Sequence, residues 1–258
     1  MRLMKRILSA AAVLALSASL LVGCSSGTAG SVPVSARSAA VSTVSSVEET
    51  ASSAVDENEA AAAQLLNDLT GSYQELWPVI LADEYKQTWL DDCTALVGED
   101  NAEAAFEKLS SMVTGDVYGE DAVKAYANGG GAYFCGFTNS LAILTFDGET
   151  STISGTDKDG NVLFSHTYHY IGMEPVRGLY EFQSDDADSG EFTYFFLAPD
   201  TSAETYHIEF RYGSDAEALS QYDTGEYAYW LASGISTDCD QTMIDNCIEL
   251  FCTENLAG

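Results

Sequence analysis

The segment Val162–Ile171, with the sequence VLFSHTYHYI, alternates large apolar or aromatic residues with other residues in the two-residue period of a β-strand. His166 and His169 therefore point to opposite faces of this strand. Short segments of the same character surround it, separated by turn signals such as Asp147-Gly148 and Asp159-Gly160. The other predicted strands are Ala132–Thr138, Leu141–Phe146, Thr150–Ser154, Gly178–Gln183, Glu191–Leu197 and Glu204–Tyr212. Strands at this spacing predict an antiparallel barrel or sandwich.

Helical patterns lie on both sides of the strands. We expect helices from about Asp56, over roughly Ser72–Asp92 with a break at Pro78, after Asn101, and over Asp121–Ala127. A last helix follows Ser236-Thr237-Asp238. Its apolar stripe, which we interpret as core, consists of Met243, Ile244, Cys247, Ile248 and Phe251. The fold class is therefore mainly β with helices (α+β).

The first 24 residues have the layout of a secretory signal. A basic start is followed by the apolar run Ile7–Val22 and by Leu21-Val22-Gly23-Cys24. The run is short for a transmembrane helix, which is the weaker interpretation. The ending resembles a bacterial lipobox, which predicts a signal peptide over 1–23, an acylated Cys24, and a lipid-anchored protein on the extracytoplasmic face of the cell membrane. The alternative is an ordinary signal peptide with a chance cysteine.

The segment after Cys24 is rich in Ser and Ala and has no aromatic residue as far as Val55. We expect residues 24–55 to be a flexible tether and 56–258 to be one folded domain. Loss of the signal would leave seven basic residues against 40 acidic ones, a net charge of about −33. Nucleic acid is therefore not an expected partner, whereas cations would gather at this surface.

Five cysteines follow Cys24: Cys93, Cys135, Cys239, Cys247 and Cys252. The last three fall in the predicted C-terminal helix, where their spacings of about 12 and 7.5 Å along the axis are unsuited to a disulfide. Any bridge must therefore join this helix to Cys93 or Cys135. The favoured interpretation is that the thiols are buried and free.

Two residues of the segment Glu204–Tyr212 suggest a metal site. His207 and Glu209 share one face of the predicted strand, at a spacing that two ligands of one ion can use. Asp200, in the preceding turn, could fold over the same surface. No nucleophile elbow, His-Glu-x-x-His motif, phosphate-binding loop or dinucleotide fingerprint occurs, so an enzyme is not expected.

Six segments, in order over about residues 65–252, resemble characteristic segments of ZinT (YodA) domains. They are Leu66–Gln74 (LNDLTGSYQ), Ala122–Tyr126 (AVKAY), Tyr168–Gly172 (YHYIG), Arg177–Phe182 (RGLYEF), Tyr206–Ser214 (YHIEFRYGS) and Ala216–Leu219 (AEAL). The resemblance implies a lipocalin-like (calycin) antiparallel barrel, preceded by N-terminal helices and closed by a C-terminal helix. It also implies zinc as the bound ion and a role in zinc recruitment, with a metal-uptake binding protein as a partner.

The resemblance is incomplete at the metal site. ZinT domains hold zinc with a histidine in the loop before the last barrel strand and with two more in a His-x-His pair. His207 matches the second histidine of the pair, Thr205 stands in place of the first, and Asp200 lies near the place of the loop histidine. The resemblance thus implies a site at His207 in which Asp200, Glu209 or His169 substitutes. The alternative is a metal-free calycin module that binds a small ligand or a partner protein at the cell surface.

Overall fold

The computed structural model describes residues 57–113 and 133–256. The predicted signal segment, the tether with Cys24, Asp56 and the helical turn at Asp121–Ala127 lie outside these residues. Within them, no helix is both long enough and apolar enough to cross a lipid bilayer.

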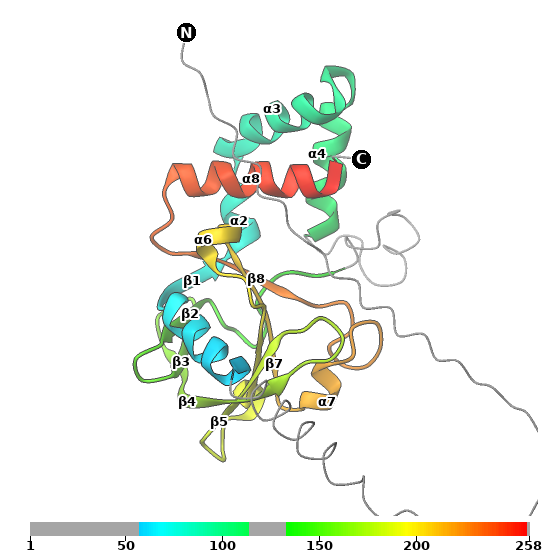
Figure 1. Cartoon of the computed structure of the whole chain (residues 1–258). Coiled ribbons are helices and arrows are strands. Elements are labelled where there is room, and N and C mark those ends of the chain that lie inside the picture. The colour runs from blue at the N-terminus through cyan, green and yellow to red at the C-terminus, as the bar shows by residue number, and fades with distance from the viewer. Residues whose placement is uncertain (1–56, 114–132, 257–258) are drawn as a thin grey trace, which may run out of the picture. The chain divides into compact units, whose positions relative to one another are not determined.

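Eight antiparallel strands form a closed barrel, in which each strand pairs with the next along the chain and β8 pairs with β1 (Figure 1). The strands are β1 (Gly71–Glu75), β2 (Ile143–Asp147), β3 (Thr152–Thr156), β4 (Val162–Met173), β5 (Tyr180–Ser184), β6 (Tyr194–Leu197), β7 (Ile208–Gly213) and β8 (Ala232–Ser236). The predicted barrel with helices before and after it is thereby confirmed.

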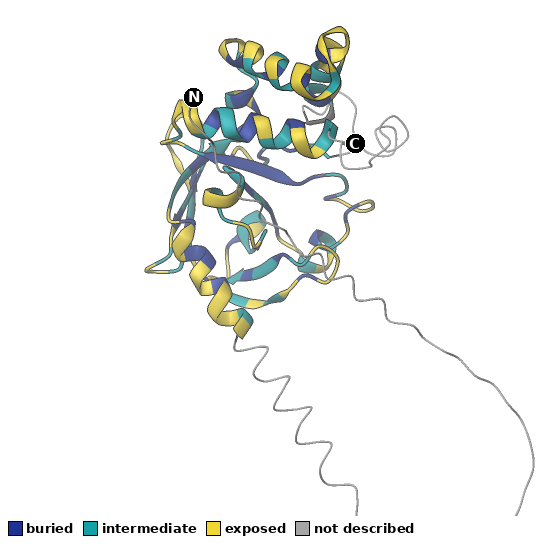
Figure 2. Ribbon diagram, turned by 45° about the horizontal axis from the view of Figure 1, so that its top comes forward, coloured by how far each residue is buried: buried dark blue, intermediate teal, exposed yellow. Residues whose placement is uncertain are grey.

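The helices lie mostly at one end of the barrel. Besides a helix over 57–68, they are α2 (Leu76–Ile80), α3 (Lys86–Val97), α4 (Glu99–Val113), α6 (Ser202–Thr205), α7 (Ala216–Leu219) and α8 (Gln241–Leu256), with 3-10 turns η1 (Asp83–Tyr85) and η3 (Gly190–Phe192). Helices α2, α3, α4 and α8 share a second hydrophobic core with Ile235 of β8. The predicted stripe of α8 is confirmed, because the face toward this core is buried and the opposite face is exposed (Figure 2).

Several segments of the barrel differ from the prediction. Residues 71–75 form β1 rather than the start of a helix, since Gly71 and the alternating Ser72-Tyr73 pair with β2 and Tyr73 enters the core. Strand β8, whose small residues carry little β signal, was not predicted. In the described part of Ala132–Thr138 there is only an isolated bridge, Phe134 to Trp230.

The strand predicted over Glu204–Tyr212 begins only at Ile208. The preceding residues form α6, which opens with a capping box between Thr201 and Glu204. Tyr206 then takes a left-handed conformation with φ of 64°, which ends the helix and turns the chain into β7. His207 therefore belongs to a turn rather than to a strand face.

Aromatic side chains fill the interior of the barrel. Phe182, Phe195, Phe210 and Tyr212 are each at most 1% exposed and belong to one core cluster. Gly155 of β3 makes room for this packing, because a Cβ there would lie 2.5 Å from the ring of Phe164. The described residues of the barrel interior thus form one packed aromatic core.

Candidate functional site

The strongest cluster of polar chemistry lies where the barrel meets α8. A cavity of about 160 Å³ opens there, between the start of β7, the loop before β5 and one face of α8. Its lining residues are Leu76, Trp77, Tyr133, Cys135, Arg177, His207, Glu209, Leu231, Ser233, Cys247, Leu250, Phe251 and Glu254. It brings an imidazole, two carboxylates and two thiols to one place.

His207 is held by the turn that precedes β7. Its Nδ1 lies 2.7 Å from the carbonyl oxygen of Thr205, and the Thr205 hydroxyl donates to the carbonyl oxygen of His207 at 2.8 Å. Because a carbonyl only accepts hydrogen bonds, Nδ1 carries a proton. Nε2 is left facing the carboxylate of Glu209, with 3.9 Å between Nε2 and Oε1. A backbone bond on one ring nitrogen that leaves the other for a ligand is the usual support of a metal-binding histidine.

The surroundings favour a proton or a cation at His207. Burial by itself lowers the pKa of His207, but its interactions with Cys247 and Glu209 outweigh burial and raise that pKa to about 10. The Sγ atom of Cys247 lies 3.9 Å from Nδ1. In the metal-free protein the ring is therefore protonated near neutral pH, and a metal ion at Nε2 would have to displace that proton.

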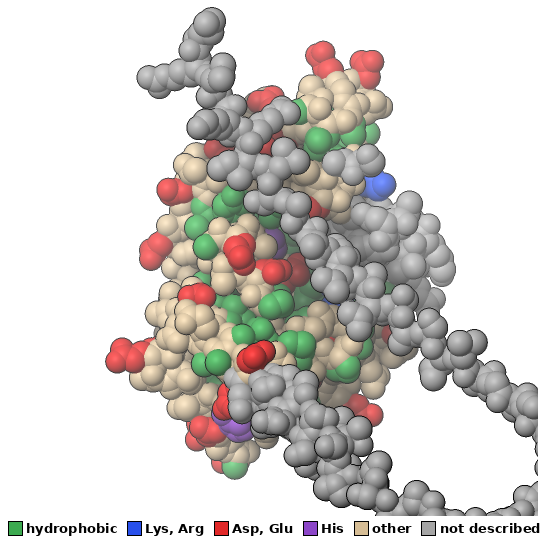
Figure 3. Space-filling view, viewed as in Figure 1, with side chains coloured by type: hydrophobic (Ala, Val, Ile, Leu, Met, Phe, Trp, Pro, Cys, Tyr) green, Lys and Arg blue, Asp and Glu red, His purple; other side chains and the backbone are tan. Residues whose placement is uncertain are grey.

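Two further carboxylates lie close enough to interact with this pair. Asp200 lines a second hollow, of about 340 Å³, that shares Glu209 and Arg177 with the first cavity. Partial desolvation and the charges of Glu204 and Glu209 raise the pKa of Asp200, although the residue is exposed overall. Partial desolvation also raises the pKa of Glu254, where the lowering effect of His207 is opposed by Glu209 and Asp200. A bound cation would relieve this repulsion. Acidic side chains are spread over the face shown in Figure 3, and few basic ones are visible there.

Arg177 bounds the site on the side of the β4–β5 loop. Its guanidinium lies 4.6 Å from the ring centres of both Tyr133 and Tyr222, which fixes its position by cation–π contact. Neither the arginine nor the thiols were predicted as parts of the site, because their approach depends on how the loop and α8 pack. The spacing of His207 and Glu209 was the usable signal in the sequence.

The structure places His169 elsewhere. Across neighbouring strands, His169 of β4 pairs with Gln183 of β5, Gln183 with Tyr194 of β6, and Tyr194 with Gly213 of β7. His207 precedes Gly213 by six residues, so it lies about 20 Å along the strand direction from the row that contains His169. His169 therefore cannot share an ion with His207, and we leave it out of the candidate ligands.

Both histidines of β4 already have carboxylate partners. Nδ1 of His169 lies 2.6 Å from Asp185, and Nδ1 of His166 lies 2.7 Å from Asp186. His166 stacks beside Phe164 toward the barrel core, whereas His169 is exposed. The prediction that the two point to opposite faces is confirmed, and each forms a separate surface pair.

Two side chains, His207 and Glu209, already lie near each other as candidate ligands. Any further ligand would have to move toward them. In the ranges 57–113 and 133–256, no group of three or more His, Cys, Asp or Glu side chains is already positioned to hold a metal ion. A tetrahedral zinc ion about 2 Å from Nε2 and from a Glu209 oxygen would hold these atoms about 3.4 Å apart. The 3.9 Å separation fits this after a shift of about half an ångström. Asp200 and Glu254 are exposed and have room to turn toward the ion.

Comparison with known proteins gives matches among solved structures alone. No protein-family model matches the chain, and no curated protein does. The Zn(II)-bound ZinT-like domain of Streptococcus pneumoniae AdcA is similar to it at 15% identity with a TM-score of 0.45, over 72% of this chain and 89% of that one. Zn(II)-bound AdcA from the same organism is similar at 14% identity with a TM-score of 0.41, over 75% of this chain and 35% of that one.

Proposed function

We propose that this chain binds a divalent metal ion, zinc or a similar ion, at His207 and Glu209 and assists its recruitment outside the cytoplasm. Asp200 and Glu254 complete the site when the ion enters. The metal is cargo that is captured and passed on, rather than a catalytic cofactor.

One observation supports the proposal: the ring of His207 is held in place by the backbone, with its second nitrogen directed at a carboxylate. The bond from Nδ1 to the Thr205 carbonyl oxygen fixes the ring, and Nε2 faces the Glu209 carboxylate at 3.9 Å. Burial, followed by repulsion from neighbouring carboxylates that include Glu209 in both cases, raises the pKa values of Asp200 and Glu254. A cation is the ligand that such a charge distribution attracts.

The ligand types also bear on affinity and selectivity. One imidazole with carboxylates holds zinc less tightly than three imidazoles would and accepts other divalent ions more readily. Two of the donors, Asp200 and Glu254, are exposed and must be drawn in. We therefore expect an exchangeable site, which suits a protein that hands its metal to another.

The predicted lipid at Cys24 would hold this domain at the extracytoplasmic face of the membrane, on the tether of residues 24–55. A net charge of about −33 after signal cleavage would raise the local concentration of cations there. In this setting the recipient of the metal would be the binding protein of a metal-uptake system.

Zinc titration by calorimetry, with the bound metal counted by elemental analysis, tests the proposal on the full chain. We expect one zinc per chain in the parent and loss of that zinc in His207→Ala. The matched control is His169→Ala, which removes an equally carboxylate-paired histidine and should bind zinc as the parent does.

Zinc binding that survives in His207→Ala, or that disappears in His169→Ala, would contradict the proposed site. If the parent binds no zinc at all, the chain is better regarded as a calycin module for another ligand or for a partner protein.

A further inference from the structure

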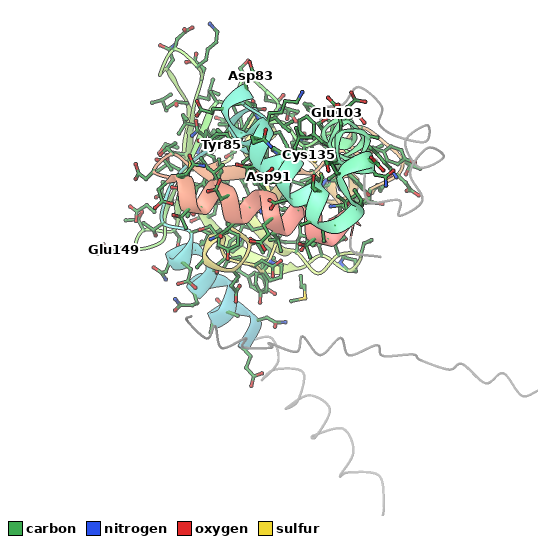
Figure 4. The ribbon with its side chains drawn as sticks, turned by 90° about the horizontal axis from the view of Figure 1, so that it is seen from above. Asp83, Tyr85, Asp91, Glu103, Cys135 and Glu149 are labelled. Atoms are coloured by element: carbon green, nitrogen blue, oxygen red, sulfur yellow. The ribbon has the colours of Figure 1, made fainter. Side chains whose placement is uncertain are left out.

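Two cysteines that are distant in sequence meet in the core between α3 and α8. Cys93 of α3 and Cys252 of α8 are separated by 159 residues, and their Sγ atoms lie 4.0 Å apart. Both side chains are fully buried, and both thiols are free in this structure. The two helices lie side by side when seen from above (Figure 4).

The other three thiols have different neighbours. Cys135 contacts the carbonyl oxygen of Tyr133, and Cys247 contacts His207. Cys239 is partly exposed in the segment before α8. In the described part of the chain, Cys93 and Cys252 form the one sulfur–sulfur contact. A bridge between them would satisfy the sequence-based expectation that any disulfide joins the C-terminal helix to Cys93 or Cys135.

The two sulfurs are already close to bonding distance. A disulfide has its sulfurs about 2.05 Å apart, so this pair, now 4.0 Å apart, must approach by about 2 Å. Disulfides persist in proteins outside the cytoplasm, where the signal segment predicts that this domain lies. We propose that Cys93 and Cys252 form a disulfide that cross-links α3 to α8 in the mature protein.

The bond would form by exchange with a disulfide oxidant, such as glutathione disulfide or an oxidoreductase. The thiolate of one cysteine attacks the oxidant, which releases one reduced thiol and leaves a mixed disulfide. The second cysteine, as thiolate, attacks the protein sulfur of that mixed disulfide and expels the other reduced thiol. The protein loses two protons and two electrons, and the oxidant is reduced to two thiols.

Burial raises the pKa of Cys93 and of Cys252, so thiolate is scarce at both positions once the domain has folded. Exchange should therefore take place during folding, before α8 closes over α3, and be slow in the native reduced protein. Once made, the bond would be shielded from reductants by the same burial.

The cross-link would stabilise one wall of the candidate metal site, but its formation does not require a metal ion. Cys252 lies on α8 between Cys247 and Glu254, which line the cavity beside His207. Fixing α8 to α3 would hold this wall of the cavity in place. The disulfide stands or falls separately from zinc binding, because its test requires no metal.

The test is to refold the full chain in a buffer of reduced and oxidised glutathione, alkylate the remaining thiols, and map the peptides by mass spectrometry. We expect a peptide pair joined through Cys93 and Cys252 and lighter by two hydrogen atoms than the separate peptides. Recovery of both cysteines in alkylated form, or either one joined to another cysteine, would overturn the proposal.

A thermal unfolding series provides the second readout. The loop that the bond closes is long, so the oxidised parent should melt roughly 10 °C above the reduced parent. Cys93→Ala and Cys252→Ala should each abolish this difference, whereas the matched control Cys239→Ser should retain it. If a core variant fails to fold, the peptide map of the parent still decides. An equal melting temperature for both redox forms would contradict the cross-link.

Discussion

The barrel interior and the junction between the barrel and α8 differ in the side chains that they contain. The interior is lined by rings such as Phe182, Phe195 and Tyr212, all at most 1% exposed. The junction gathers His207, Glu209 and other polar or thiol groups around a cavity of about 160 Å³. The titratable side chains of the candidate site therefore lie at the end of the barrel and not among its interior rings.

This difference teaches that stability and binding are separable in this chain. A packed aromatic core tolerates no cavity without cost, and it contributes no ligand to an ion. The junction also rests on packed residues, those of the second hydrophobic core, but its partly exposed polar side chains, such as Glu209 and Glu254, contribute little to folding. Substitutions in the two regions should therefore have different consequences, which the following predictions use.

The largest effect is expected from Phe195→Ala in the barrel. Phe195 is fully buried, and its ring centre lies 5.8 Å from Phe164 and 5.4 Å from both Tyr168 and Tyr212. The cavity should lower the free energy of unfolding by about 3–5 kcal/mol, measured by urea denaturation, while folded molecules bind zinc normally. Val162→Ala, at a position 71% exposed, is the control and should change stability by less than about 0.5 kcal/mol. Loss of zinc binding by folded Phe195→Ala would contradict the claim that stability and zinc binding depend on different regions.

Glu209→Gln should have the converse effect. Loss of a group that supports a metal ligand typically weakens affinity by about 10- to 100-fold, and loss of a direct ligand should cost at least as much. The domain should remain folded, because Glu209 lies near other carboxylates and is partly exposed. Calorimetric zinc titration gives the affinity, and Asp185→Asn, at the His169 pair, is the matched control. Equal affinities for Glu209→Gln and the parent would exclude Glu209 as a ligand.

The pH dependence of zinc affinity sharpens the comparison at the junction. Because interactions with Cys247 and Glu209 raise the pKa of His207 to about 10, the ring is protonated throughout the range from pH 6 to 8. Zinc must displace one proton, so affinity should rise with pH by about tenfold per unit across that range. Competition titrations at several pH values would measure it. A flat profile would mean that His207 does not coordinate the ion.

The smallest effect is expected at the rim of the cavity. Glu254 is exposed on α8, so it is the more weakly held of the proposed donors. Glu254→Gln, which keeps one side-chain oxygen, should weaken zinc binding less than Glu209→Gln does, by about tenfold, without a change in stoichiometry. Complete loss of the ion in this variant, seen by elemental analysis, would mean that α8 supplies a principal ligand.

The candidate site was partly predictable from the sequence. The two-residue spacing indicated His207 with Glu209, and the pair does lie together, although His207 occupies a turn rather than the predicted strand. The capping residues Thr201 and Glu204 were a local signal of that turn. The approach of Cys247 and Glu254 could not be predicted, since it depends on how α8 docks against the barrel. His169 was named as a substitute ligand because neighbouring strands meet at a barrel mouth, and the strand register separates it from His207.

The fold shows the same division between local and distant information. Strands with strong alternation, such as β4, and helices with a clear apolar face, such as α8, were recognisable from local pattern. Strands β1 and β8 were not, because each is short and rich in small or polar residues. Their pairing, Tyr73 with Ser236, closes the barrel across more than half of the chain. A pairing between such distant segments produces no hydrophobic periodicity in either segment that would predict it.

Anomalous diffraction at the zinc edge, from crystals of the zinc-loaded protein, tests the central claim most directly. We predict one zinc peak about 2 Å from Nε2 of His207, with an oxygen of Glu209 in its coordination sphere. A peak at the His169–Asp185 pair, or a fully loaded protein with no zinc at the junction of β7 and α8, would contradict the account.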